Sequence, residues 1–296
     1  LQSQNKHDEA INNYNRAIDL EPSASEPYYN LGNTLNELGR YAEAISNFHE
    51  ALELKAKYPD AYDRLARALA NYRATSYSEQ LANSYLKILN LKIHIRPADI
   101  CQATIALLKC HATVKKIINA RDLNKLDESF VDVCVDLSKI PLFLKILELS
   151  YITDLSIEGV LVKLRRSLLL NRNSVLKNDD LLKFQSSLAL QCFHNEFIYE
   201  ETEEETFALE KLEKDVFDKW SSNNESLSEH DIACLASYRP LHNYSWARGL
   251  KPPSNLEQLC RRQITEVQKQ HESRRSIPSL KPLDNKVSQA VQNQYE

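Results

Sequence analysis

Two pairs of polar side chains recur near the start of the chain with a spacing that suits peptide binding. Asn30 and Asn33 lie three residues apart, and Arg64 and Arg67 occupy the same positions 34 residues later. An asparagine amide can donate to and accept from a peptide backbone, and a guanidinium can pair with a carboxylate. These four are the candidate partner-binding residues. The alternative is that they are ordinary solvated helix residues.

A second candidate is a compact loop, rich in aromatic and basic residues, in the C-terminal third. It contains Tyr238, Arg239, His242 and Trp246. This density of aromatic and cationic side chains predicts a contact with a neighbouring domain. A structural corner inside a helical domain is the equally acceptable alternative.

Other side chains that could act as catalytic acids or bases lack the neighbours that catalysis requires. His194 lies beside Glu196, and His242 lies near Tyr244. Neither pair accompanies a nucleophile motif, so both histidines are interpreted as structural. The acidic residues within 200–205 suggest a cation site at first sight. They fit a solvated helix start better, because the helix dipole favours carboxylates there.

The charge pattern does not favour a polyanionic partner. The chain has 37 basic and 41 acidic residues, a net charge of -4, which gives no field to attract nucleic acid or an anionic membrane. The basic pairs Arg165-Arg166 and Arg261-Arg262 are interleaved with acidic residues. No stretch approaches the about 18 apolar residues of a membrane-spanning helix. We therefore predict a cytoplasmic protein that binds neither nucleic acid nor membrane.

The cysteines and glycines exclude further chemistry. The six cysteines are dispersed without a Cys-x-x-Cys pair, so they are predicted to be reduced and buried, with no metal site. The only glycines are Gly32, Gly39, Gly159 and Gly249. No two are close enough to form a loop that cradles a phosphate or a dinucleotide. We expect neither a cofactor nor a catalytic residue in this chain.

The candidate binding residues lie in a segment that repeats itself every 34 residues. The recurring pairs are Ala10 and Ala44, Ala17 and Ala51, Leu20 and Leu54, Tyr28 and Tyr62, and Leu31 and Leu65. A 34-residue period with these residue types resembles the tetratricopeptide repeat (TPR), a pair of helices. This resemblance implies that Asn30 and Asn33 lie on the first helix of a repeat, which lines a concave groove. It implies a protein-binding scaffold.

Hydrophobic spacing predicts an all-α fold, a short TPR array followed by a non-repeating α-helical domain. The TPR region, 1–73, is predicted to contain helices at 7–20, 26–38, 41–54 and 60–70. The helical domain, 74–272, has apolar stripes at 81–91, 100–108, 131–137, 142–149, 160–170, 181–198, 202–220, 232–238 and 256–272. Residues 273–296 are predicted to be a linker and the lead-in to a further domain, with a last amphipathic stretch at 285–295.

Three later segments carry a second resemblance. They are residues 188–204 (LALQCFHNEFIYEETEE), residues 237–242 (SYRPLH) and residues 287–296 (VSQAVQNQYE). Together with the repeats, these segments are similar to bacterial TPR-containing class I S-adenosylmethionine-dependent methyltransferases. In that family the last segment precedes the catalytic domain. The resemblance implies that the cofactor loop and all catalytic residues would follow Glu296, with S-adenosylmethionine as the cofactor of that domain.

Two functions are therefore expected from the sequence. The first is a scaffold that presents a substrate or a protein partner to a methyltransferase domain outside this chain. The second is a free-standing TPR adaptor that binds a peptide and has no enzymatic activity. Residues 1–20 supply only the second helix of a repeat, so we also expect the sequence to be a fragment. The methyl acceptor, the peptide partner and the oligomeric state are not predicted.

Overall fold

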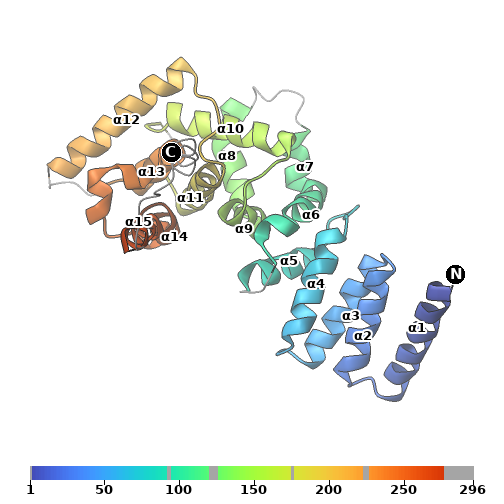
Figure 1. Ribbon diagram of the computed structural model, residues 1–296. Helices are drawn as coiled ribbons and strands as arrows, with labels where there is room; N and C mark the ends of the chain where they lie inside the picture. Colours follow the sequence, from blue (N-terminus) through green and yellow to red (C-terminus); the bar gives the residue numbers. More distant parts are fainter. Residues whose placement is uncertain (1, 92–94, 120–125, 175–176, 223–226, 277–296) are drawn as a thin grey trace, which may run out of the picture.

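The computed structural model describes residues 2–91, 95–119, 126–174, 177–222 and 227–276. Within these ranges all regular structure is helical and there is no strand. Figure 1 shows the helices in chain order from α1–α4 at one end of the molecule to α12–α15 at the other. The all-α fold predicted from the hydrophobic spacing is confirmed.

The repeat region forms four helices close to the predicted bounds. They are α1 (Gln2–Leu20), α2 (Ser25–Glu37), α3 (Tyr41–Leu54) and α4 (Pro59–Asn71). Pro59 is the first residue of α4, where its missing N–H costs no helical hydrogen bond and its fixed φ suits a helix start. The predicted and observed bounds differ by one residue at most for α2, α3 and α4.

Small residues allow α2 and α3 to pack closely as an antiparallel pair. Ala44 and Ala51 on α3 are fully buried. A Cβ atom added at Gly32 of α2 would lie 2.8 Å from the ring of Phe48, so only glycine fits there without movement. Gly39 closes the turn between the two helices with a φ of 74°, a conformation that glycine adopts without steric cost.

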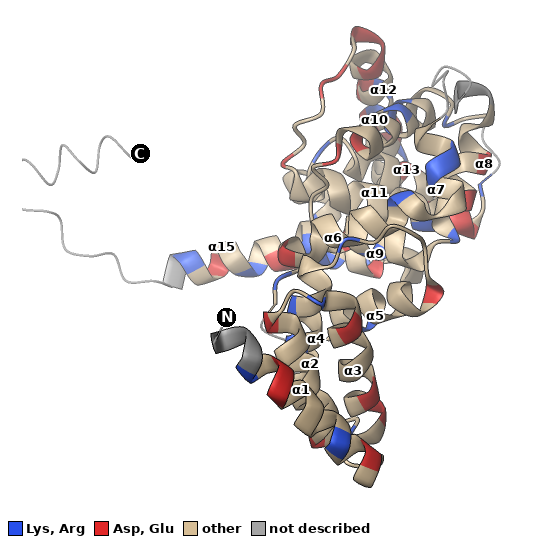
Figure 2. Cartoon of the chain, turned by 90° about the vertical axis from the view of Figure 1, so that its right-hand side faces the viewer, with Lys and Arg blue, Asp and Glu red and all other residues tan. Residues whose placement is uncertain are grey.

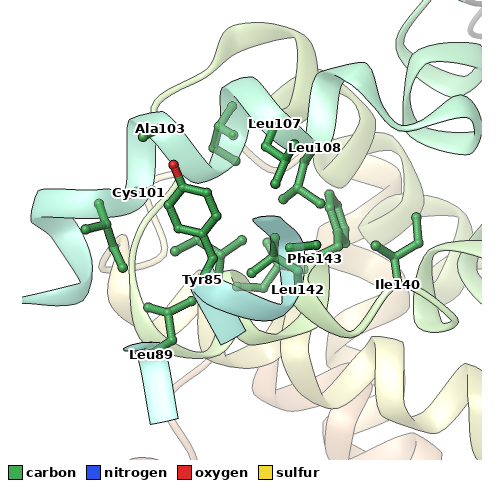
Figure 3. Close-up of a cluster of buried hydrophobic side chains, with 14 of the residues drawn as sticks. Tyr85, Leu89, Cys101, Ala103, Leu107, Leu108, Ile140, Leu142 and Phe143 are labelled. Carbon is green, nitrogen blue, oxygen red and sulfur yellow. The ribbon is translucent and has the colours of Figure 1, made fainter. Parts of the chain in front are cut away.

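The helical arrangement continues beyond the last recognisable repeat through a shared core. The next helices are α5 (Glu79–Asn90), α6 (Pro97–Cys110), α7 (Ala112–Ile118), α8 (Leu126–Ser138) and α9 (Pro141–Leu149). Figure 3 shows Tyr85 of α5 among apolar side chains of α6 and α9. The Tyr85 hydroxyl donates to the Leu69 carbonyl of α4 over 2.8 Å, which ties α5 to the repeats. Helix α7 was not predicted, because seven residues are too few to show a clear period.

The remaining helices include α11, which is buried along most of its length and packs against α8, α9 and α13. They are α10 (Leu155–Leu170), α11 (Asp179–His194), α12 (Glu203–Ser221), α13 (Glu229–Ala236), α14 (Glu257–Cys260) and α15 (Glu266–Ser276). Short 3-10 segments connect α13 to α14 at η2 (Leu241–Asn243), η3 (Ser245–Gly249) and η4 (Ser254–Leu256). A π turn, η5 (Arg261–Thr265), joins α14 to α15.

Two predicted helices are shortened or interrupted most clearly in the structure. The stripe at 181–198 was predicted as one helix, but α11 ends at His194. Glu196 and Phe197 both have a φ of 58°, which is incompatible with a right-handed helix. The predicted helix at 256–272 is divided by the π turn. Residues 285–295, predicted to form an amphipathic stretch, lie outside the described residues.

The buried apolar residues form two clusters whose limits differ from the predicted boundary at residue 73. One cluster extends from Leu31 in α2 to Cys192 in α11. The other extends from Leu169 in α10 to Ile264 in the π turn. The repeats therefore share a core with the first half of the helical region.

Candidate partner-binding surface

The four candidate binding residues lie on two helices that occupy equivalent places in successive repeats. Asn30 and Asn33 are on α2, and Arg64 and Arg67 are on α4. A spacing of three residues places the members of each pair on the same side of their helix. The structure thus brings each pair together on one helix face, as the 34-residue period predicted.

The four side chains are accessible and uncommitted among the described residues. Arg64 and Arg67 are exposed, and Asn30 and Asn33 are half-buried. No hydrogen bond or ion pair within the described residues involves any of their side chains. At Asn30 it is the backbone carbonyl that accepts a bond, from the Thr34 hydroxyl over 3.1 Å. The two guanidinium groups remain available to an anionic partner.

Asn36 extends the asparagine pair, and the sequence reasoning missed it. It lies three residues after Asn33 on α2, so the three amides follow one another along the helix. The Oδ1 atoms of both Asn33 and Asn36 are buried without a hydrogen-bond partner in the structure. A buried acceptor without a partner costs about 1–3 kcal/mol, so a donor that reached either oxygen after a rotation of its side chain would stabilise the protein. The i, i+3, i+6 spacing of asparagines was the available signal.

Aromatic residues fix the position of α2 beside this surface. Tyr29 lies 4.9 Å from Tyr58 and 6.2 Å from Phe48, measured between ring centroids. The Lys55 ammonium lies 4.5 Å from the centre of the Tyr58 ring, and burial raises the pKa of Tyr58. These contacts hold α2 against the start of α4, so the asparagine and arginine pairs are presented by rigid elements.

The aromatic and basic loop after α13 is built into the second apolar cluster. Tyr238 and Trp246 are buried within the chain, at 1% and 2% exposure. Arg239 forms a bidentate pair with Glu201, and His242 Nδ1 lies 3.2 Å from the Gln263 carbonyl oxygen. These contacts are those of a structural corner inside the helical region. Contact with a further domain stays a prediction for the more accessible Arg239 and His242.

A buried arginine connects this loop to α10 and α12. Arg165 is 1% exposed, and its guanidinium lies 4.2 Å from the centre of the Tyr238 ring. It donates to the Glu200 carbonyl over 2.9 Å and lies 3.5 Å from the Glu205 carboxylate. Tyr238 donates to the same carboxylate over 2.8 Å. These bonds satisfy Glu205, so the buried charge pair has a structural role rather than a catalytic one.

The histidines considered for catalysis make structural contacts. His194 Nε2 lies 2.8 Å from the Glu148 carbonyl oxygen, while its sequence neighbour Glu196 is exposed after the helix end. Because a carbonyl oxygen only accepts, His194 donates from Nε2. Burial lowers the pKa of His194, which favours the neutral ring.

His49 and Ser84 lie at the distance of a catalytic dyad, but the direction of their hydrogen bond is the wrong one for catalysis. His49 Nε2 lies 2.8 Å from the Ser84 hydroxyl, beside a cavity of about 290 Å³. That hydroxyl also donates its single proton to the Gln80 carbonyl over 2.7 Å. His49 therefore donates to Ser84 rather than removing its proton. Activation of a serine nucleophile requires the opposite arrangement.

Basic side chains in the helical region form ion pairs with acidic ones. Arg166 pairs with Glu204, and Arg262 pairs with Glu266, both over 2.8 Å. Figure 2 shows basic and acidic residues alternating along α15 rather than gathered by sign. In the part of the chain that the structure describes, no group of His, Cys, Asp or Glu is placed to hold a metal ion. No described helix is both long and apolar enough to span a membrane.

Comparison with known protein families identifies the N-terminal part of the chain. A TPR repeat model matches residues 1–39, and a tetratricopeptide repeat model matches residues 25–58. A search of curated proteins gives no significant match. The N-terminal region, which carries Asn30 and Asn33 within the matched residues, therefore consists of tetratricopeptide repeats.

Proposed function

We propose that the chain is a protein-interaction scaffold whose surface on α2 and α4 binds a peptide segment with acidic character. The observation that carries the proposal is that two exposed guanidinium groups without a partner among the described residues, on α4, lie on the repeat next to the half-buried amides of Asn30 and Asn33 on α2. Arg64 and Arg67 suit a carboxylate of the partner. The side-chain amides of Asn30 and Asn33 suit its backbone groups.

A peptide-display selection on the intact chain tests this proposal. We expect the selected peptides to be enriched in Asp and Glu. The quadruple variant Asn30→Ala, Asn33→Ala, Arg64→Ala, Arg67→Ala should bind them at least about tenfold more weakly, because hydrogen bonds to charged groups contribute about 1.5–3 kcal/mol. Its melting temperature should stay close to that of the parent, since two of the four residues are exposed, two are half-buried, and residues away from the packed core usually contribute within about 0.5 kcal/mol each.

The matched control for this test replaces two asparagines and two basic residues elsewhere on the chain. Asn83, Asn173, Lys211 and Lys214 are all exposed and lie outside α2 and α4. Their quadruple alanine variant should keep the affinity of the parent. Equal binding by both quadruple variants would place the binding surface elsewhere and leave the repeats a role as a structural spacer.

We further propose that this scaffold presents a substrate or protein partner to an S-adenosylmethionine-dependent methyltransferase domain. The support is the resemblance of residues 188–204, 237–242 and 287–296 to segments of the bacterial TPR-containing enzymes. The test is titration calorimetry of the full product of the parent gene with S-adenosylmethionine. Binding of the cofactor, with a glycine-rich β-α unit encoded after Glu296, is the expected outcome.

The alternative is a free-standing adaptor, which the same experiment distinguishes. A gene product without a glycine-rich unit, giving no heat with the cofactor, would remove the methyltransferase proposal. Peptide binding by α2 and α4 would be unaffected by that result, because it depends on Asn30, Asn33, Arg64 and Arg67 alone.

A further inference from the structure

A polar cavity lies away from the repeats, between helices that are distant in sequence. It has a volume of about 580 Å³ and is lined by α9, α11, η4, α14 and the start of the π turn. Figure 1 shows α9, α11 and α14 as neighbours in the second half of the molecule. Cavities of about 300–1,000 Å³ are the size that small ligands occupy. This space is therefore large enough for a small molecule.

One carboxylate on the wall of the cavity is held in a fixed position. The Glu148 side chain is 22% exposed. Its Oε1 accepts from the Ser187 hydroxyl over 3.3 Å, and its Oε2 accepts from the Gln258 amide over 3.2 Å. A carboxylate has about four acceptor positions, so two bonds leave it able to accept from a cationic donor. The nearest basic side chain, Lys145, stands 3.9 Å away, beyond a hydrogen bond.

Two cations line the same cavity with only weak partners of their own. Lys183 pairs with Asp180 over 3.0 Å on its own helix, and Arg261 lies 3.7 Å from Glu266. Both basic side chains are 61% exposed, so these pairs contribute little and can exchange for a ligand. Glu257 also lines the cavity. The two glutamates and the two basic side chains balance, so the wall has no net charge. Such a lining disfavours a purely anionic or purely cationic ligand.

The π turn at the edge of the cavity provides an independent sign of a specialised site. Gln263 of this turn is fully buried and donates to the Ala189 and Ala236 carbonyls, both over 3.1 Å. It also accepts from the Leu241 backbone N–H over 3.1 Å. The turn is thereby fixed to three elements, with Arg261 at its start lining the cavity. Single π turns are rare in proteins, and those that occur often lie at functional sites.

We propose that this cavity binds a small zwitterion of the amino acid type. Its ammonium group is bound by the Glu148 carboxylate, and its carboxylate by Arg261 and Lys183. The hydroxyls of Ser186 and Ser254 and the amide of Asn255 supply further polar contacts. This site is independent of the peptide-binding surface on α2 and α4.

Saturation-transfer NMR with a mixture of the twenty proteinogenic amino acids tests the proposal on the intact chain. At least one amino acid should receive saturation. Its carboxamide and its N-acetyl derivative, which each lack one charge, should bind at least about tenfold more weakly, because each loses a hydrogen bond to a charged group. The absence of saturation transfer to any of the twenty amino acids at millimolar concentration would overturn the proposal.

Matched variants separate binding in the cavity from binding elsewhere. Glu148→Gln keeps the side-chain size, and Arg261→Gln replaces the charge with a shorter neutral polar group; each should weaken binding at least about tenfold. Arg262→Gln and Glu210→Gln remove charges that do not line the cavity, and should leave the affinity unchanged. Melting temperatures show that the variants are folded. Equal affinity in all four variants, or equal binding of the uncharged derivatives, would contradict the assignment.

Discussion

At the scale of single residues, the repeats depend on small side chains at the α2–α3 contact. Gly32 stands against the ring of Phe48, whereas Gly159 in α10 has open space beside its helix where a Cβ would be. The two glycines therefore differ in whether a larger side chain would fit. One is required by packing, and the other only weakens its helix.

Substituting these two glycines should change stability in opposite directions. Gly32→Ala should lower the free energy of unfolding by about 1–3 kcal/mol, because a methyl group at 2.8 Å from Phe48 forces the helices apart. Gly159→Ala should raise it by about 0.5–1 kcal/mol, since alanine favours a helix interior. Urea denaturation of both variants measures the difference. A stable Gly32→Ala protein would mean that the α2–α3 contact is looser than the structure shows.

The buried histidines should make the fold sensitive to mild acid. Burial lowers the pKa values of His49, His194 and His230 below the ordinary value of 6.5. Below that value the unfolded chain binds protons that the folded chain does not. The free energy of unfolding should therefore fall as the pH falls from 7 to 5.

The variant His49→Gln, His194→Gln should lose part of this acid sensitivity. Melting temperatures at pH 7 and pH 5 provide the measurement, and the exposed His271→Gln serves as the control. A melting temperature as dependent on pH in the double variant as in the parent would show that other groups control the acid response.

At the scale of helices, the sequence predicted where most helices lie because their ends carry local signals. Thr202 and Glu205 form a capping box at the start of α12, and Ser228 accepts from the Asp231 backbone N–H. The end of α11 was misplaced because apolar spacing continues through Phe197 while the backbone turns at Glu196. The Phe197 backbone N–H closes this turn by donating to the Cys192 carbonyl and to the Asn195 side chain, bonds that apolar spacing does not reveal.

The capping box of α12 gives a prediction at this scale. Thr202→Ala removes the acceptor of the Glu205 backbone N–H and a donor to the Glu205 carboxylate. It should lower stability by about 0.5–2 kcal/mol, the usual cost of losing such a cap. Thr206→Ala, one turn into the same helix and exposed, is the control and should be nearly neutral. Thermal denaturation compares the two; equal losses would show that the cap is not decisive.

At the scale of the whole molecule, the sequence predicted the repeats and the all-α class but not how the parts join. Repetition is visible because equivalent residues recur, whereas the core shared by α4, α5 and α6 brings together residues with no common pattern. The cavity near Glu148 was invisible for the same reason. Its walls come from three stretches of chain that only folding places side by side.

Cutting the chain between Arg73 and Ala74 should damage both products. The cut separates Tyr85 from Leu69 and divides the cluster that extends from Leu31 to Cys192. Scanning calorimetry of residues 1–73 and 74–296, each expressed alone, should show lower melting temperatures than the intact chain. Two products that melt as the intact chain does would instead establish residue 73 as a true domain boundary.

The six free cysteines differ in exposure, which should allow one of them to be labelled selectively with a fluorescent dye. Five are buried, and burial raises the pKa of each, to about 12 for Cys192 and Cys234. Cys110 alone is partly exposed, at the end of α6 and 3.8 Å from the Ala74 carbonyl oxygen. A thiol-reactive dye should therefore attach at one position without mutagenesis, since this thiol is the one that solvent reaches. Its emission would report directly on the junction between the repeats and the helices that follow.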